Sequence, residues 1–92
     1  MRYEWDERKR VSNLEKHGLD FVDARVVHEA LHKVTLEVTR PRDRELRFAD
    51  FAEVGGGVLK FVYAMRGQIV RCISFRSASR LERKVFYEIR NR

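Results

Sequence analysis

Arginines and a tyrosine gather near the C-terminus of this 92-residue chain in a pattern that could hold phosphate. Arg76 follows an apolar stretch that we predict to be a strand. In the helix predicted after it, Arg80, Arg83, Lys84 and Tyr87 share one side, by the 100° step per residue. Guanidinium groups match phosphate oxygens and keep their charge at neutral pH. A basic face with a tyrosine, beside an arginine at a strand end, therefore suits a bound phosphate chain.

The positive charge of the chain is concentrated in this same stretch. The net charge is +6, yet residues 1–65 hold 12 Lys or Arg against 12 Asp or Glu. Residues 66–92 hold 8 Lys or Arg against only Glu82 and Glu88. A charged run often does no more than keep a surface solvated. Because the whole excess lies in the last 27 residues, we favour a polyanion or an acidic protein as partner.

Two further residues could transfer protons. Histidine is a common acid or base near neutral pH, so His17 could transfer protons, or it could only satisfy backbone groups between two helices. Glu45 and Arg47 are two residues apart on a predicted strand and should therefore point to the same face. They form either a simple ion pair or a site in which Glu45 is a general base and Arg47 binds phosphate. The sequence leaves these alternatives open.

The sequence contains no recognised metal or cofactor motif. The three histidines and Cys72 show no ligand spacing, and Gly55–Gly57 lacks the Lys-Ser/Thr of a phosphate-binding loop. We expect no metal and no cofactor. The lone Cys72 cannot form an internal disulfide, and its apolar strand suggests a buried thiol in a reducing compartment. No apolar run approaches the roughly 20 residues of a membrane span. We expect a cytoplasmic protein that is not bound to membranes.

The helices and strands that must position these residues are those of a single α+β domain, which we predict over residues 1–92. A short edge strand, Arg2–Trp5, precedes a helix capped by Asp6, which runs to about His17 and stops at Gly18. Asp20 caps a second helix to about Ala30, so that the two form a helical hairpin. The apolar face of the second helix contains Phe21, Ala24, Val27 and Leu31.

The rest of the chain predicts a small, mostly antiparallel sheet followed by a C-terminal helix. Strands are expected over 34–39, from Glu45 onward, over 58–65 and over 69–75; the third is apolar on both faces, as in the middle of a sheet. Regular alternation along the last strand puts Arg71 and Arg76 on opposite faces. Ser79 and Glu82 form a capping box at the start of the final helix.

Three motifs of fixed spacing run through nearly the whole chain in order. They are Trp5-Asp6-x-x-Lys9-x-x-x-Asn13-x-x-Lys16-His17-Gly18-x-x-Phe21-x-x-Ala24, then Glu45-x-Arg47-Phe48, then Tyr63 followed by Arg71-Cys-Ile-Ser-Phe-Arg76-x-Ala78-x-x-x-Glu82-Arg83-x-x-x-Tyr87. With them the chain resembles the BrnT family of bacterial toxins, which have a RelE-like fold. It departs from the family in having Asp50-Phe-Ala-Glu53 where a glycine is usual, and Phe75 where a small residue is usual.

The resemblance implies a ribonuclease toxin of a type II toxin–antitoxin system that inhibits translation. Its partner would be a BrnA-like antitoxin of the ribbon-helix-helix class. The pair would form a heterotetramer that binds operator DNA only through the antitoxin. We expect the antitoxin to cover the basic face at least in part. The alternative is a non-catalytic module that binds nucleic acid or an acidic partner through that face.

The resemblance also implies an endoribonuclease that needs no metal, in which the ribose 2′-OH attacks the adjacent phosphate. Such an enzyme must move two protons and stabilise charge on the phosphorane. Arg76 and Arg83 would stabilise this charge, and Tyr87 would stack a base or donate a hydrogen bond. Either His17 or Glu45 would transfer the proton. Residues expected to bind the RNA backbone are Lys16, Arg47, Arg80 and Lys84.

Overall fold

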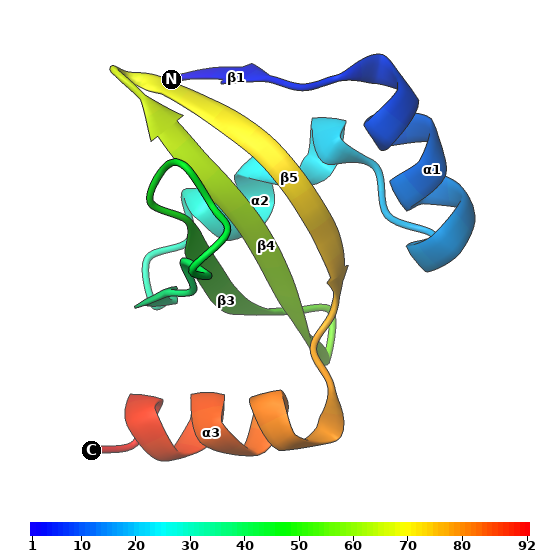
Figure 1. The fold of residues 1–92 in the computed structure, drawn as a ribbon. Helices are drawn as coiled ribbons and strands as arrows, with labels where there is room; N and C mark the ends of the chain where they lie inside the picture. Colours follow the sequence, from blue (N-terminus) through cyan, green and yellow to red (C-terminus); the bar gives the residue numbers. More distant parts are fainter.

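The computed structural model describes residues 1–92 and contains one five-stranded sheet with the order β1-β5-β4-β3-β2 (Figure 1). Only β1 is parallel to its neighbour, β5; the other pairs are antiparallel. The α+β class, the mostly antiparallel sheet and the central place of the strand predicted over 58–65 are therefore confirmed. The strands are β1 (Arg2–Glu4), β2 (Val34–Glu37), β3 (Phe48–Val54), β4 (Gly57–Arg66) and β5 (Ile69–Ser77).

The helices begin and end largely where local signals place them. The helices are α1 (Glu7–His17), the 3-10 helix η1 (Phe21–Asp23), α2 (Arg25–His28) and α3 (Arg80–Arg90). Asp6 accepts hydrogen bonds from two backbone amides of α1, and Gly18 ends that helix with a φ of 70°. Ser79 and Glu82 form the expected capping box. The two longest helices have 11 residues, and no helix has the length and apolarity needed to cross a bilayer.

The second helix is shorter than predicted. The expected helix from Asp20 to about Ala30 is divided into η1 and the single turn α2, so the predicted helical hairpin is reduced to one long helix followed by two short turns. Phe21, Ala24 and Val27 are buried as expected, but Leu31 is 94% exposed. The buried residues recur every third position, which matches a 3-10 helix better than an α-helix and leaves Leu31 outside the pattern.

The two faces of the sheet carry separate hydrophobic cores. The larger core lies under η1 and α2 and consists of Phe21, Ala24, Val27, Ala52, Phe61, Tyr63, Val70, Cys72 and Phe75. The smaller core lies under α3 and consists of Ala49, Phe51, Val58 and Phe86. α3 follows the end of β5 and lies across that end of the sheet (Figure 1). The remainder of this second face, which we call the open face, has no helix over it.

A buried carboxylate ties α2 to the sheet. Asp50 of β3 is fully buried and accepts hydrogen bonds from Thr35 and Tyr63, at 2.7 and 2.8 Å, and from Lys33 at 3.0 Å. His28 Nδ1 lies 2.7 Å from the same carboxylate. Burial alone would raise the pKa of Asp50, but these hydrogen bonds hold it below the usual value. The cluster satisfies a charge that would otherwise be costly to bury.

A β-bulge interrupts β5. Val62 pairs with Ser74 and Tyr63 pairs with Cys72, so Ile73 is an extra residue with no partner on β4. Such a bulge reverses the order in which side chains alternate between the two faces of a strand.

This reversal overturns the prediction that Arg71 and Arg76 lie on opposite faces. Cys72 and Phe75 both lie in the larger core, although they are three residues apart. Arg71 is paired with Ala64, and Arg76 with Lys60, at positions of β4 that alternate with those facing the larger core. Both arginines therefore lie on the open face. The bulge depends on strand pairing and leaves no local signal in the sequence.

Candidate functional site

The open face of the sheet contains a polar cavity of about 300 Å³. The strands β4 and β5 supply part of its lining, and the segment between β2 and β3 supplies the rest. Three of its lining residues are cationic, and none is acidic. The lining residues are Val38, Arg40, Arg47, Lys60, Val62, Ile73 and Ser74.

A second cavity, of about 210 Å³, continues from the first toward α1. It is lined by Lys9, Ser12, Asn13, Lys16, His17, Ile73 and Ser74. Ile73 and Ser74, the residues at the bulge, line both cavities. The two cavities together, which we call the basic groove, therefore place His17 and Lys16 of α1 on the same surface as Arg47 and Lys60.

Asn13 places α1 beside the groove. Its side-chain amide donates to the carbonyl of Phe75 at 2.7 Å, and its side-chain oxygen accepts from the Phe75 N–H at 3.0 Å. β1 pairs with β5 only as far as Arg71, so Phe75 lies beyond the reach of that strand. The Asn13 side chain therefore replaces the peptide group that a neighbouring strand would supply, and it satisfies the backbone hydrogen-bonding groups of Phe75 at the sheet edge. It also donates to the Leu19 carbonyl at 3.0 Å, which fixes the turn after α1.

Arg76 and Lys60 share one carboxylate at the α3 end of the groove. Arg76 forms a two-point ion pair with Glu82, at 2.9 and 3.1 Å, and Lys60 Nζ lies 2.7 Å from the same side chain. Partial burial would raise the pKa of Glu82, but the hydrogen bonds from Arg76 and Lys60 lower it to about 2. The carboxylate therefore stays ionised, and the three groups carry a net positive charge.

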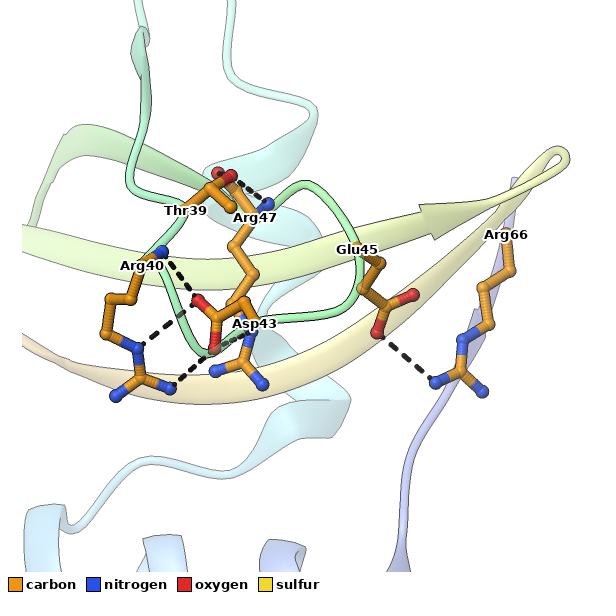
Figure 2. A network of polar contacts seen from close by, with 6 residues as sticks. All are labelled: Thr39, Arg40, Asp43, Glu45, Arg47 and Arg66. Atoms are coloured by element: carbon orange, nitrogen blue, oxygen red, sulfur yellow. Dashed lines mark hydrogen bonds and ion pairs between the residues drawn. The ribbon is translucent and has the colours of Figure 1, made fainter.

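In the segment between β2 and β3, two of the four arginines, Arg40 and Arg47, lie around Asp43 (Figure 2). Asp43 accepts from the Arg40 backbone at 2.8 Å and from its guanidinium at 3.0 and 3.2 Å. These hydrogen bonds lower the pKa of Asp43. Arg47 Nε lies 3.5 Å from Asp43 but is a buried donor without a hydrogen bond. Arg47 therefore has unused hydrogen-bonding capacity beside the groove.

Glu45 and Arg47 do not share the face of a strand as predicted. β3 begins only at Phe48, because its ladder with β2 ends at the pair Glu37–Phe48, and both residues precede it. Arg47 lines the groove, whereas Glu45 forms an ion pair of 3.4 Å with Arg66 and does not line it (Figure 2).

The predicted residues of α3 lie on a different surface. An open hollow of about 520 Å³ is lined by Arg80, Leu81, Arg83, Lys84 and Tyr87, and none of them lines the basic groove. The Tyr87 hydroxyl donates to Glu53, and this hydrogen bond raises the pKa of Tyr87. The structure thus brings Arg76, Arg47, Lys16 and His17 to one groove or its edge, and separates them from Arg83 and Tyr87.

Comparison with known families decides the class of the protein. A family described as "Ribonuclease toxin, BrnT, of type II toxin-antitoxin system" matches residues 5–82. The chain belongs to the BrnT family. Its members are ribonuclease toxins of type II toxin–antitoxin systems, so an antitoxin is its expected partner. No curated protein matches the sequence. The match contains the whole basic groove and ends before Arg83 and Tyr87.

Sequence reasoning about this BrnT-family chain missed Lys60. This lysine stands in the middle of β4, within an otherwise apolar run, and its side chain is only 16% exposed. A lysine in a central strand requires a counter-charge, and this requirement could have marked Lys60 as a candidate site residue. The identity of that counter-charge, Glu82, depends on how α3 meets the sheet. No three His, Cys, Asp or Glu side chains are arranged to hold a metal ion.

Proposed function

We propose that this BrnT-family toxin cleaves RNA in the basic groove without a metal ion. The ribose 2′-OH attacks the adjacent phosphate, which gives a 2′,3′-cyclic phosphate and releases a 5′-OH. The 2′-OH proton must be taken up, a proton must be delivered to the leaving 5′ oxygen, and cations must stabilise the phosphorane; one imidazole that takes up the first proton and returns it can serve both transfers. The observation that supports the proposal is that Ile73 and Ser74 line both cavities, so that the cavity of His17 adjoins the cationic cavity.

The reacting phosphate would contact Arg47, Lys60 and Arg76. Arg47 lines the cationic cavity with a side chain that is 24% exposed, and its ion pair with Asp43 is as long as 3.5 Å, so its guanidinium could donate to a phosphate oxygen. Lys60 and Arg76 already hold two oxygens of Glu82 at 2.7 to 3.1 Å. The same donors suit a phosphate, because guanidinium and ammonium groups bind carboxylate and phosphate oxygens alike.

His17 is the better candidate for proton transfer. It lies at the end of α1 and lines the same cavity as Ile73 and Ser74, which also line the cationic cavity. Glu45, the other candidate, is held by Arg66 outside the groove lining. An imidazole can accept and return a proton near neutral pH. We therefore propose His17 as the general base or acid and leave Glu45 with a structural ion pair.

The cations of α3 would bind RNA away from the reacting phosphate. Arg80, Arg83, Lys84 and Tyr87 line one hollow, which suits contacts with backbone phosphates and one base. Lys16 would contact the backbone at the other end, beside His17. In this arrangement Arg83 and Tyr87 contribute to binding of the RNA and not to the chemical step.

The finer features implied by the resemblance belong to the same proposal. We expect a RelE-like arrangement, inhibition of translation, and a BrnA-like ribbon-helix-helix antitoxin in a heterotetramer. The operator DNA would be bound through the antitoxin.

The test is incubation of purified protein with RNA in EDTA. We expect cleavage with 2′,3′-cyclic phosphate ends. His17→Gln and Arg76→Gln should each lower kcat/KM by about 100-fold. Arg25→Gln is the matched control, because it removes one cation from α2 on the opposite face of the sheet. Intact RNA with folded protein would refute the nuclease site and favour a binding module. Activity that requires added metal would refute the mechanism alone.

A further inference from the structure

Most of the apolar side of α3 has no partner within the chain. Of the four apolar residues that share this side, Phe86 alone is buried, in the smaller core. Leu81 is 70% exposed and Val85 is 36% exposed, and Ile89 is only partly covered. Polar contacts of Glu82 and Tyr87 also hold α3 to the sheet, but Phe86 is its one buried apolar side chain, and the other three form a row beside it. Rows of this kind mark sites of protein association.

This row of α3 side chains lies opposite β2, the edge strand of the sheet. Between α3 and β2 lies an apolar groove of about 230 Å³, of which eight of the ten lining residues are hydrophobic. β2 contributes Val34 and Leu36, and it has no neighbour on its outer side. The remaining lining residues are Val38, Phe51, Lys60, Leu81, Glu82, Val85, Phe86 and Ile89. The groove therefore has a helix on one side and apolar residues of an edge strand on the other.

The apolar groove continues into the basic groove. Val38 and Lys60 line both, so that a chain lying between α3 and β2 would reach the ammonium group of Lys60. The helix that forms one side of the apolar groove is basic, because α3 holds four basic residues and two acidic ones, and one of the acidic residues, Glu82, is already paired with Lys60 and Arg76. A partner for this surface should therefore have apolar side chains on one side and a net negative charge.

We propose that the apolar groove binds a net-acidic, amphipathic segment of the antitoxin. Its apolar side chains would contact Leu81, Val85 and Leu36. One of its carboxylates would reach Lys60 and cover the entrance to the basic groove. The existence of an antitoxin follows from the family, whereas inhibition by covering this entrance rests on the proposed function. A second copy of the toxin suits the site less well, because two copies would bring surfaces of the same charge together.

The test measures binding of the cognate antitoxin, by calorimetry with purified proteins. Leu81→Asp places a charge in the proposed contact and should weaken binding by about 30-fold. Leu81→Ala should also weaken binding, but by less, and because alanine favours a helix this variant keeps α3 intact. Val26→Asp is the matched control, since Val26 is 53% exposed and lies on α2, on the opposite face. Circular dichroism confirms that each variant is folded.

The outcomes separate this inference from the proposed nuclease site. Binding is measured without RNA, so a toxin that fails to cleave RNA would leave the expected loss for Leu81→Asp unchanged. Wild-type affinity for Leu81→Asp, or an equal loss for Val26→Asp, would overturn the inference. A Leu81→Asp variant that loses only self-association, while it binds antitoxin normally, would assign the groove to a second copy and would equally overturn it.

Discussion

Replacement of Glu82 by glutamine should destabilise the protein through the loss of one charge. A glutamine can still accept the hydrogen bond from the Ser79 backbone that completes the capping box at 2.8 Å. It cannot form the ion pairs with Arg76 and Lys60, which would be left partly buried without a counter-charge. Glu82→Gln therefore isolates the electrostatic role of Glu82 from its role as a cap.

The magnitude follows from the pKa of Glu82. A decrease from 4.5 to about 2 on folding corresponds to an upper limit of about 3 kcal/mol of stability at pH 7. The side chain is 23% exposed, so solvent screening reduces this value. We expect Glu82→Gln to lower the free energy of unfolding by about 1–2 kcal/mol, which would shift a urea midpoint by about 1 M.

The pH dependence gives the sharper measurement. Because folding lowers the pKa of Glu82, its contribution is complete above pH 4.5 and is lost as the pH falls toward 2. Urea unfolding of the wild type and of Glu82→Gln should therefore differ at pH 7 and converge near pH 2. Glu88→Gln, an exposed position of the same helix, should match the wild type throughout. A difference that does not change with pH would refute the electrostatic reasoning and assign the loss to packing.

Three further predictions concern buried polar groups. Asp50→Ala leaves several buried donors without an acceptor and should lower the free energy of unfolding by about 3–5 kcal/mol, against about 1–2 kcal/mol for Tyr63→Phe; equal losses in urea unfolding would contradict the central role of the carboxylate. Asn13→Ala should cost about 2–3 kcal/mol and speed hydrogen exchange at the Phe75 amide, and unchanged protection there would contradict its role at the sheet edge. Burial raises the pKa of the Cys72 thiol to about 12, so a thiol reagent at pH 8 should modify only unfolded protein; rapid reaction of the native protein would refute this.

The features that were predicted correctly depend on residues close together in the chain. Asp6 begins the first helix through the hydrogen bonds of its side chain, and Gly18 ends it through its positive φ. The residue types at these two positions were therefore enough to predict the bounds of the helix. The capping box of Ser79 and Glu82 is likewise contained in four residues. The apolar run at the centre of the sheet follows from composition alone.

The features that were missed depend on residues brought together by folding. The side chain that partners Lys60 is 22 positions away, and the ladder that excludes Glu45 from β3 is set by pairing with β2. The helical wheel of α3 correctly separated its apolar and basic sides. It could not show that the basic side, with Arg83, faces away from the groove that contains Arg47.

The bulge at Ile73 makes the length of β5 a functional property. With one residue fewer between Arg71 and Arg76, regular pairing would turn the second guanidinium into the hydrophobic interior and expose Phe75 to water. A point substitution at Ile73 keeps this register, whereas deletion of one residue would reverse the faces of the residues that follow. When related sequences are aligned, a gap here should therefore count as stronger evidence against a shared activity than several amino-acid differences elsewhere in the strand.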